Sequence, residues 1–292
     1  MTVIYDGDNR TVELEQGLTL LEHSQAHDIE HAQVCRGKAR CSTCRVAILD
    51  GISHCSPRNP DETRLAEKYG FADNVRLACQ CIPSGPVRIR RLIRDDVDMR
   101  LFKGADRAHE QQLAILFADI RSFTAFSERQ SPYDIVHILN RYFEAMGGAI
   151  LRHGGTIDKY LGDGIMALFG VDDDDDTGSC ESAFAAAGEM LIRLIPFNHY
   201  LERNFGEEFQ IGIGIHLGSA VIGELGHSEY RHRTAIGDAV NIAARIEAAT
   251  KTLGVPLLIS EQMMRHLDLA GWSPHTLSLK GKADTLIAYA PP

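Results

Sequence analysis

Six of the seven cysteines lie close together in the N-terminal third of the chain, and four of them have a spacing that suits an iron–sulfur cluster. Cys35, Cys41 and Cys44 form a C-x5-C-x2-C pattern on one short segment. Cys79 follows in a separate segment and can supply a fourth thiolate. Four thiolates, three from one loop and one from elsewhere, can hold a single [2Fe-2S] cluster.

Two alternatives stay open for these cysteines. Four thiolates also bind structural zinc, although zinc sites usually contain two C-x2-C pairs and this segment contains one. Cys81 lies two residues from Cys79 and competes with it for the position of the fourth ligand. We interpret Cys55 and Cys180 as small apolar side chains.

The cysteine pattern, together with the segment Arg76–Gln80, resembles the [2Fe-2S] ferredoxin family over residues 1–94. The five-residue gap between the first two cysteines is similar to that of the adrenodoxin type rather than the plant type. The resemblance implies a β-grasp domain that binds the cluster through Cys35, Cys41, Cys44 and Cys79.

Two aspartates further along the chain have the character of divalent-metal ligands. Asp119 directly follows the apolar segment Leu113–Ala118, and Asp163 lies in a Gly-Asp-Gly turn between two predicted strands. A carboxylate at the end of a strand is fixed in position and still accessible. Mg²⁺ prefers such oxygen ligands in combination with substrate phosphates.

Three segments around these aspartates resemble class III adenylate and guanylate cyclases. The resemblance extends over about residues 110–290 and implies a ferredoxin-like (βαββαβ) domain, so that the whole protein is of the α+β class. The matching segments are Phe117–Thr124, Asp158–Gly170 and Thr234–Arg245.

Carried over by position, the resemblance assigns metal binding to Asp119, Asp163 and the backbone carbonyl of Ile120. Two Mg²⁺ or Mn²⁺ ions per site would activate the ribose 3′-hydroxyl and neutralise the triphosphate. The hydroxyl then attacks the α-phosphate, and pyrophosphate leaves. Asn241 and Arg245 match the pair that acts on the transition state, and their spacing of four residues lets both lie on one helix face.

The resemblance also indicates the substrate. Lys159 and Thr234 occupy the purine-selecting positions, where guanylate cyclases typically have Glu and Cys, so ATP is favoured over GTP. Lys280 matches a phosphate-contacting lysine, and Lys282 is close enough to compete with it. Ser219 departs from the pattern, because some relatives carry a phosphate-binding Arg there.

The family builds each active site from two protomers, and this chain contains both sets of residues, so the resemblance implies a homodimer. We therefore predict an adenylate cyclase that makes cyclic AMP from ATP and is regulated by the redox state or integrity of its [2Fe-2S] cluster. The alternative is an iron–sulfur electron carrier, supplied by a ferredoxin reductase, in which the cyclase fold serves only nucleotide sensing and dimerisation.

Length and composition agree with two globular domains, since the chain has 292 residues, 44% of them hydrophobic and 24% charged. We expect a ferredoxin-type domain over 1–94, a linker over 95–109 and a catalytic domain over 110–292. The net charge of -10 argues against nucleic-acid binding. No apolar run approaches the roughly 20 residues of a membrane-spanning helix, and no signal peptide is evident, so we predict a cytoplasmic protein without membrane insertion.

Hydrophobic periodicity and turn residues predict the elements that position these side chains. In the first domain they are a hairpin over 3–14, a helix over 19–27 and strands over 45–49 and 87–93. In the second domain they are a strand over 113–118, a helix from Ser131 to Gly154, a hairpin around Gly162–Gly164, a helix over 181–194, strands over 210–217 and 220–224, a helix over 238–250, and strands near Leu257 and Ala288.

Overall fold

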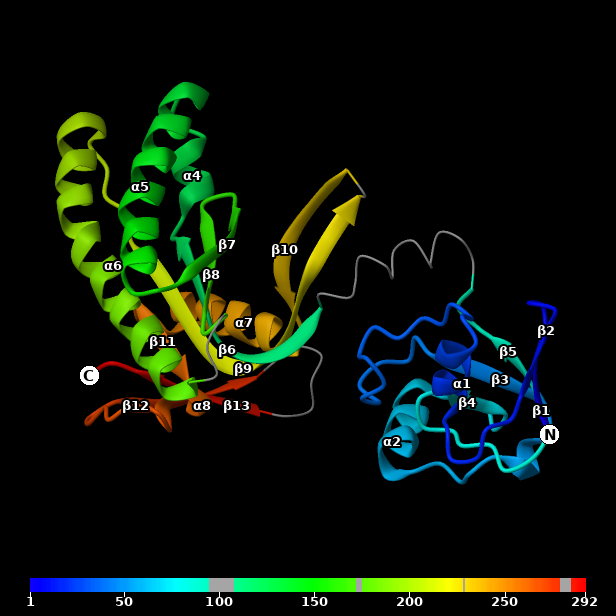
Figure 1. The fold of residues 1–292 in the computed structure, drawn as a ribbon. Coiled ribbons are helices and arrows are strands. Elements are labelled where there is room, and N and C mark those ends of the chain that lie inside the picture. The colour runs from blue at the N-terminus through cyan, green and yellow to red at the C-terminus, as the bar shows by residue number, and fades with distance from the viewer. Residues whose placement is uncertain (95–107, 172–174, 228, 279–284) are drawn as a thin grey trace. The chain divides into compact units, whose positions relative to one another are not determined.

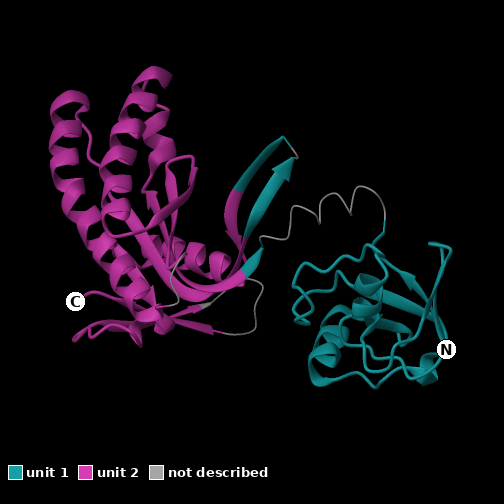
Figure 2. Ribbon diagram, viewed as in Figure 1, with its two compact units in different colours: residues 1–109, 223–232 teal, residues 110–222, 233–292 magenta. Residues whose placement is uncertain are grey.

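The computed structural model describes residues 1–94, 108–171, 175–227, 229–278 and 285–292. The chain divides into two compact units, which Figure 2 separates by colour. The N-terminal unit contains residues 1–109 together with 223–232, and the C-terminal unit contains residues 110–222 and 233–292. Most of the predicted linker, residues 95–107, lies outside the described residues.

The N-terminal residues form a five-stranded sheet with the strand order β2-β1-β5-β3-β4. Its first two strands form the predicted antiparallel hairpin, and β1 pairs in parallel with β5. Along β5, buried and exposed residues alternate, so one face of the sheet packs against the core. The strands are β1 (Thr2–Tyr5), β2 (Arg10–Glu13), β3 (Arg45–Asp50), β4 (Val75–Leu77) and β5 (Val87–Arg91).

The N-terminal unit also contains the helices α1 (Leu20–Ala26) and α2 (Pro60–Tyr69) and the short 3₁₀ helix η1 (Ile52–His54). The helix α1 was predicted, and it begins with a capping box. The Glu22 N–H donates to the Thr19 hydroxyl at 3.2 Å, and the Thr19 N–H donates to the Glu22 carboxylate at 2.7 Å. These reciprocal bonds satisfy two backbone donors that a helix start leaves unpaired.

The helix α2 was not predicted from the sequence, although Asn59 caps its N-terminus. It positions Glu62, whose buried carboxylate accepts bonds of 2.9 and 2.8 Å from the Arg76 guanidinium. The Leu77 N–H donates a third bond of 2.7 Å to the same carboxylate. A buried charge is tolerated only with such partners. The ion pair therefore fastens α2 to β4, two residues before Cys79.

In the C-terminal unit the strand order is β12-β13-β11-β9-β6-β8-β7, with β10 paired to β9 (Figure 1). The chain order β6, α5, β7, β8, α6, β9 is the predicted βαββαβ arrangement. The elements are β6 (His109–Ile120), α4 (Phe123–Ser127), α5 (Pro132–Arg152), β7 (Thr156–Leu161), β8 (Gly164–Phe169), α6 (Asp176–Phe205), β9 (Ile211–His227), β10 (Tyr230–Ile236), α7 (Asp238–Leu253), β11 (Leu257–Ser260), α8 (Glu261–Met264), β12 (Ser273–Ser278) and β13 (Thr285–Ala290).

The predicted helix over 181–194 is too short, because α6 has 30 residues and continues through Pro196. Proline removes a hydrogen bond from a helix interior and costs about 3 kcal/mol. Beyond it, Phe197 and Leu201 are buried in the core, and their burial offsets this cost. Among the described residues, no helix, α6 included, is both long and apolar enough to cross a membrane.

The predicted strands over 210–217 and 220–224 are a single strand, β9, which continues through Gly218. A Cβ at Gly218 would lie 2.7 Å from the Cβ of Ala239 on α7. The glycine therefore makes room for a helix and does not mark a turn. The strand β10, which pairs with β9, was not predicted.

Candidate active site

Asp119 and Asp163 line one pocket of about 270 Å³ in the C-terminal unit. Asp119 lies near the end of β6, and Asp163 lies in the turn between β7 and β8. The two carboxyl groups are close enough to interact electrostatically. A Cβ at Gly164 would lie 3.2 Å from the Asp119 Oδ1, so the glycine keeps this approach open. Ile120, the third residue expected to bind metal, lines the same pocket.

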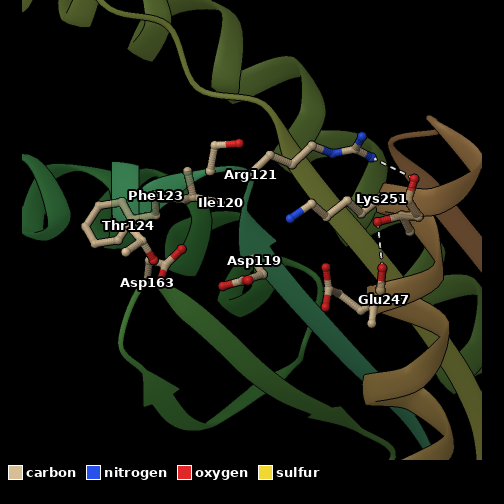
Figure 3. A pocket seen from close by; sticks show the side chains of 11 residues that line it. Asp119, Ile120, Arg121, Phe123, Thr124, Asp163, Glu247 and Lys251 are labelled. Carbon is tan, nitrogen blue, oxygen red and sulfur yellow. Dashed lines mark hydrogen bonds between the residues drawn. The ribbon is translucent and has the colours of Figure 1, made fainter. Parts of the chain in front are cut away.

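The pocket concentrates negative charge. Burial, and then the charge of Asp163, raises the pKa of Asp119 to about 6. Burial and the charge of Asp119 raise the pKa of Glu247 to about 7. Figure 3 shows the Glu247 carboxylate directed toward Asp119. A divalent cation relieves such repulsion, so these residues fit one.

The carboxylates alone do not complete a metal site. Among the described residues, no group of three or more His, Cys, Asp or Glu side chains is arranged to hold a metal ion. Two protein carboxylates supplemented by substrate oxygens is the arrangement that Mg²⁺ favours over a closed protein cage. The pocket therefore fits an ion that arrives with, or is shared by, a phosphate substrate.

Two cations near the pocket were not recognised from the sequence. Lys251 is directed toward Asp119 (Figure 3), and its positive charge acts to lower the pKa of that carboxyl. The Arg121 guanidinium donates to the backbone carbonyls of Thr250, at 3.2 Å, and Val255. Arg121 therefore braces the C-terminal end of α7. The available sequence signal was the spacing of four residues between Glu247 and Lys251, which places both side chains on one face of a helix.

The two predicted purine-selecting residues contact each other directly. The Lys159 Nζ donates to the Thr234 Oγ1 at 2.7 Å, although the residues lie on different strands. The Thr234 hydroxyl donates to the Asp158 Oδ2 at 2.8 Å, and the Ala235 N–H donates to the other carboxylate oxygen at 3.2 Å. Asp158, whose side chain is 1% exposed, also pairs with Lys159 at 3.1 Å. This positioning role of Asp158 was not predicted from the sequence.

Asn241 and Arg245 lie on α7, as predicted, and neither of them lines the Asp119 pocket of the same chain. Glu247 and Lys251 lie on the same helix and do line it. At 3.6 residues per turn, the two pairs point about 120° apart around the helix axis. The structure thus gives α7 two functional faces.

Ser219, which stands where some relatives carry a phosphate-binding Arg, lies within the described residues. The Ser219 hydroxyl donates to the Glu110 Oε1 at 2.7 Å. Lys280 and its competitor Lys282 lie outside the described residues.

The cysteine loop of the N-terminal unit is shaped by unusual backbone conformations. Arg36, Gly37 and Ala39 all have positive φ angles, of 53°, 78° and 49°. The loop directs three backbone N–H groups, those of residues 38, 40 and 41, at the Cys35 sulfur. The Ala39 N–H is similarly directed at the sulfur of Cys79. Such donors stabilise thiolates, the form that binds iron.

The four predicted ligands form two adjacent pairs. The Cys44 thiol donates to the Cys79 sulfur at 3.5 Å. The Cys41 thiol donates to the Cys35 sulfur, and this bond lowers the pKa of Cys35 to about 5. The bond from Cys44 lowers the pKa of Cys79 to about 7. Two pairs, one for each iron, suit a [2Fe-2S] cluster better than a single zinc ion, which needs four sulfurs around one point.

Cys81, the alternative fourth ligand, does not join these pairs. Its thiol forms a hydrogen bond with the sulfur of Cys55 instead. Gln80 lies between the competitors in sequence, and its side chain donates to the Cys79 sulfur at 3.3 Å. The geometry therefore favours Cys79 over Cys81 as the fourth ligand.

Comparison with known proteins identifies the families of both domains. Residues 106–289 match the family model of the adenylate and guanylate cyclase catalytic domain. The chain belongs to this cyclase family. Residues 3–84 match the 2Fe-2S iron-sulfur cluster binding domain, so the cyclase also carries a ferredoxin-type domain for a [2Fe-2S] cluster.

Several relatives of this cyclase are themselves adenylate cyclases. The adenylate cyclase of Anabaena cylindrica is 41% identical over 195 residues, which are 62% of this chain and 37% of that protein. Adenylate cyclase 1 of Rhizobium meliloti (strain 1021) is 33% identical over 202 residues, or 68% of this chain and 30% of that protein. This cyclase thus matches only about a third of the length of these relatives.

Solved structures of both nucleotide specificities share the fold. The guanylyl cyclase Cya2 is 30% identical with a TM-score of 0.59, covering 63% of this chain and 92% of that one. The adenylyl cyclase CyaB from P. aeruginosa is 25% identical with a TM-score of 0.57, covering 63% and 95%. The choice between ATP and GTP therefore depends on individual side chains and not on the fold.

Proposed function

We propose that this cyclase converts ATP to 3′,5′-cyclic AMP and pyrophosphate. The observation that carries the proposal is the presence of Asp119 and Asp163 in one pocket, where burial and the charge of Asp163 act against the ionised Asp119 carboxylate and so favour a divalent cation. The names of the adenylate cyclases from Anabaena cylindrica and Rhizobium meliloti support the choice of product.

The residues divide the chemical work. When bound by Asp119, Asp163 and the Ile120 carbonyl, two divalent cations supply charge neutralisation for the triphosphate and lower the pKa of the ribose 3′-hydroxyl. The hydroxyl oxygen attacks the α-phosphorus, the bond to the β-phosphate oxygen breaks, and the hydroxyl proton passes to water. Lys251, directed toward the pocket, stabilises the negative charge that accumulates on the leaving pyrophosphate.

Adenine selection rests on the contact between Lys159 and Thr234. The buried Asp158 accepts a hydrogen bond from the Thr234 hydroxyl, which leaves a lone pair of that oxygen for the adenine N6 amino group. The Lys159 ammonium can donate to the adenine N1 acceptor. Guanine presents an N–H group at N1 and a carbonyl at C6, so it offers the opposite pattern and is rejected.

The active unit is a homodimer with two equivalent sites. Asn241 and Arg245 do not line the pocket of their own chain, so we assign them to the pocket of a second protomer. There Arg245 stabilises charge on the α-phosphoryl group, and Asn241 orients the ribose. Lys280, by its position in the family pattern, contributes a further phosphate contact.

Mixing two inactive variants tests this arrangement. Asp163→Asn disables the metal pocket, and Arg245→Ala disables the partner face, so each alone should lose cyclic AMP formation. Random mixing makes about half of the dimers mixed, each with one intact site of two, so about a quarter of the wild-type activity should return. Restoration with ATP but not GTP supports the proposal. No restoration, or no cyclic product from the wild-type protein, contradicts it.

We further propose that the [2Fe-2S] domain regulates the cyclase in the cytoplasm, where a ferredoxin reductase can supply electrons. A bound cluster stores one electron, and the added charge can bias a two-state dimer. Turnover should therefore differ by several-fold between oxidised and dithionite-reduced protein under anaerobic conditions. Equal turnover in both states and after cluster removal would refute the regulatory role and leave the cyclase activity itself untouched.

A further inference from the structure

The N-terminal unit contains a second pair of cysteines in addition to the four assigned to the cluster. Cys55 follows η1 and is partly exposed, whereas Cys81 is completely buried. The Cys81 thiol forms a hydrogen bond with the Cys55 sulfur. The cysteines of this unit therefore fall into two groups, the four assigned to the cluster and the pair Cys55 and Cys81.

The backbone around this pair is fixed by a short antiparallel pairing. Cys55 forms an isolated bridge with Pro83. The Ser56 N–H donates to the Ile82 carbonyl at 2.9 Å, and the Ser84 N–H donates to the His54 carbonyl at 2.8 Å. In such a pairing, residues two positions apart in register lie on the same face. The pairing therefore places Cys55 and Cys81 on the same face of the backbone.

Comparison with Cys180 shows that the environment of Cys55 is not that of an ordinary core cysteine. Cys180 is buried on α6, where burial and the nearby Asp176 carboxylate raise its pKa to about 12. The pKa of Cys55 is lowered, first by the hydrogen bond with Cys81 and also by the charge of Arg76. A partly exposed thiol near a cation is the kind that oxidants attack.

We propose that Cys55 and Cys81 are a second redox centre, a dithiol that hydrogen peroxide oxidises to a disulfide. The Cys55 sulfur attacks one peroxide oxygen, the O–O bond breaks, and a sulfenic acid and one water form. The Cys81 sulfur then displaces the hydroxyl group as a second water while the S–S bond forms. The two thiols lose two electrons and two protons in total, and the peroxide takes up both.

The disulfide would act on the neighbouring cluster site. Cys81 lies two residues after Cys79, the fourth cluster ligand, so the new bond would tie that segment to η1. A cross-link restricts the open states through which a segment releases its ligand. The linked protein should therefore lose its cluster to a chelator several-fold more slowly than the dithiol protein.

Peptide mapping of the cluster-loaded full chain tests the proposal. Protein prepared without oxygen is treated with increasing hydrogen peroxide, free thiols are alkylated, and peptides are separated without reductant. We expect a Cys55–Cys81 linked peptide at peroxide levels that leave the visible absorption of the cluster intact. The link should be absent from Cys55→Ser and unchanged in the matched control Cys180→Ser.

Two outcomes would overturn the proposal. One is a wild-type protein in which both cysteines stay alkylatable until the cluster has been destroyed. The other is a cross-link that joins Cys81 to a cluster ligand such as Cys79. Because both outcomes are read in the wild-type chain, the test does not depend on how well a variant folds.

Discussion

Removing the charge of Glu247 should stabilise the metal-free protein. Glu247 faces Asp119 across the pocket, and burial with that repulsion raises its pKa from 4.5 to about 7. For a fully buried group, this rise corresponds to about 3 kcal/mol against the charged form. Because the side chain is partly exposed, we expect Glu247→Gln to gain about 1 to 2 kcal/mol at pH 8. For a chain of this size the melting temperature should rise by about 2 to 8 °C.

The sign of the pH dependence follows from proton binding. Between pH 4.5 and about 7, Glu247 holds its proton in the folded state but loses it in the unfolded state. Folded protein binds more protons in this window, so its stability falls as the pH rises. The gain in the free energy of unfolding from Glu247→Gln should therefore be full above about pH 7 and vanish near pH 4.5. Thermal unfolding in chelator at a series of pH values measures it.

A control and a metal titration make this test sharper. Glu202→Gln, on the exposed surface of α6, should leave the melting temperature unchanged at every pH. Added Mn²⁺ should stabilise the wild type more than Glu247→Gln, because the cation relieves repulsion that the variant lacks. Two results would refute the electrostatic reasoning: a Glu247→Gln variant with the melting temperature of the wild type at pH 8, or one whose melting temperature rises as much at pH 4.5 as at pH 8.

Three further predictions concern other side chains. Lys251→Ala should raise the KM for ATP and the inhibition constant of pyrophosphate about tenfold, whereas Lys251→Arg should leave both constants close to those of the wild type. Steady-state kinetics measures both constants. Asp158→Asn leaves one acceptor oxygen for the two donors, the Thr234 hydroxyl and the Ala235 N–H, so the ratio of kcat/KM for ATP to that for GTP should fall about tenfold. Cys79→Ser should abolish the visible absorption of the cluster, and Cys81→Ser should retain it; the reverse result would exchange their roles.

Local signals predicted the elements whose ends carry strong sequence markers. The helix α5 begins with Ser131 as its cap and Pro132 in the first turn, as expected. The extent of α6 could not be predicted in this way, because Pro196 suggests a helix end, whereas the burial of Phe197 and Leu201 in the core favours a continued helix. The predicted break between residues 217 and 220 was wrong for a similar reason, because Gly218 makes room for Ala239, a residue distant in sequence.

The candidate site shows the same division. The family pattern identified Asp119 and Asp163 by position, and the structure brings them into one pocket. The family pattern did not identify Glu247 or Lys251 as pocket residues, because an acidic residue and a lysine on an amphipathic helix usually face solvent. Only the packing of α7 beside the end of β6 turns these two side chains toward the aspartates.

The course of the chain around α7 gives a physical reason for coupling between the two proposed active sites of a dimer. One face of this helix carries Glu247 and Lys251 into the pocket of its own chain, and another presents Asn241 and Arg245. The helix begins four residues after Thr234, which Lys159 and Asp158 hold on β10. Because a helix moves as a rigid body, a shift that improves one pocket also displaces the residues offered to the other. A regulatory domain therefore needs to move only α7 to change both sites together.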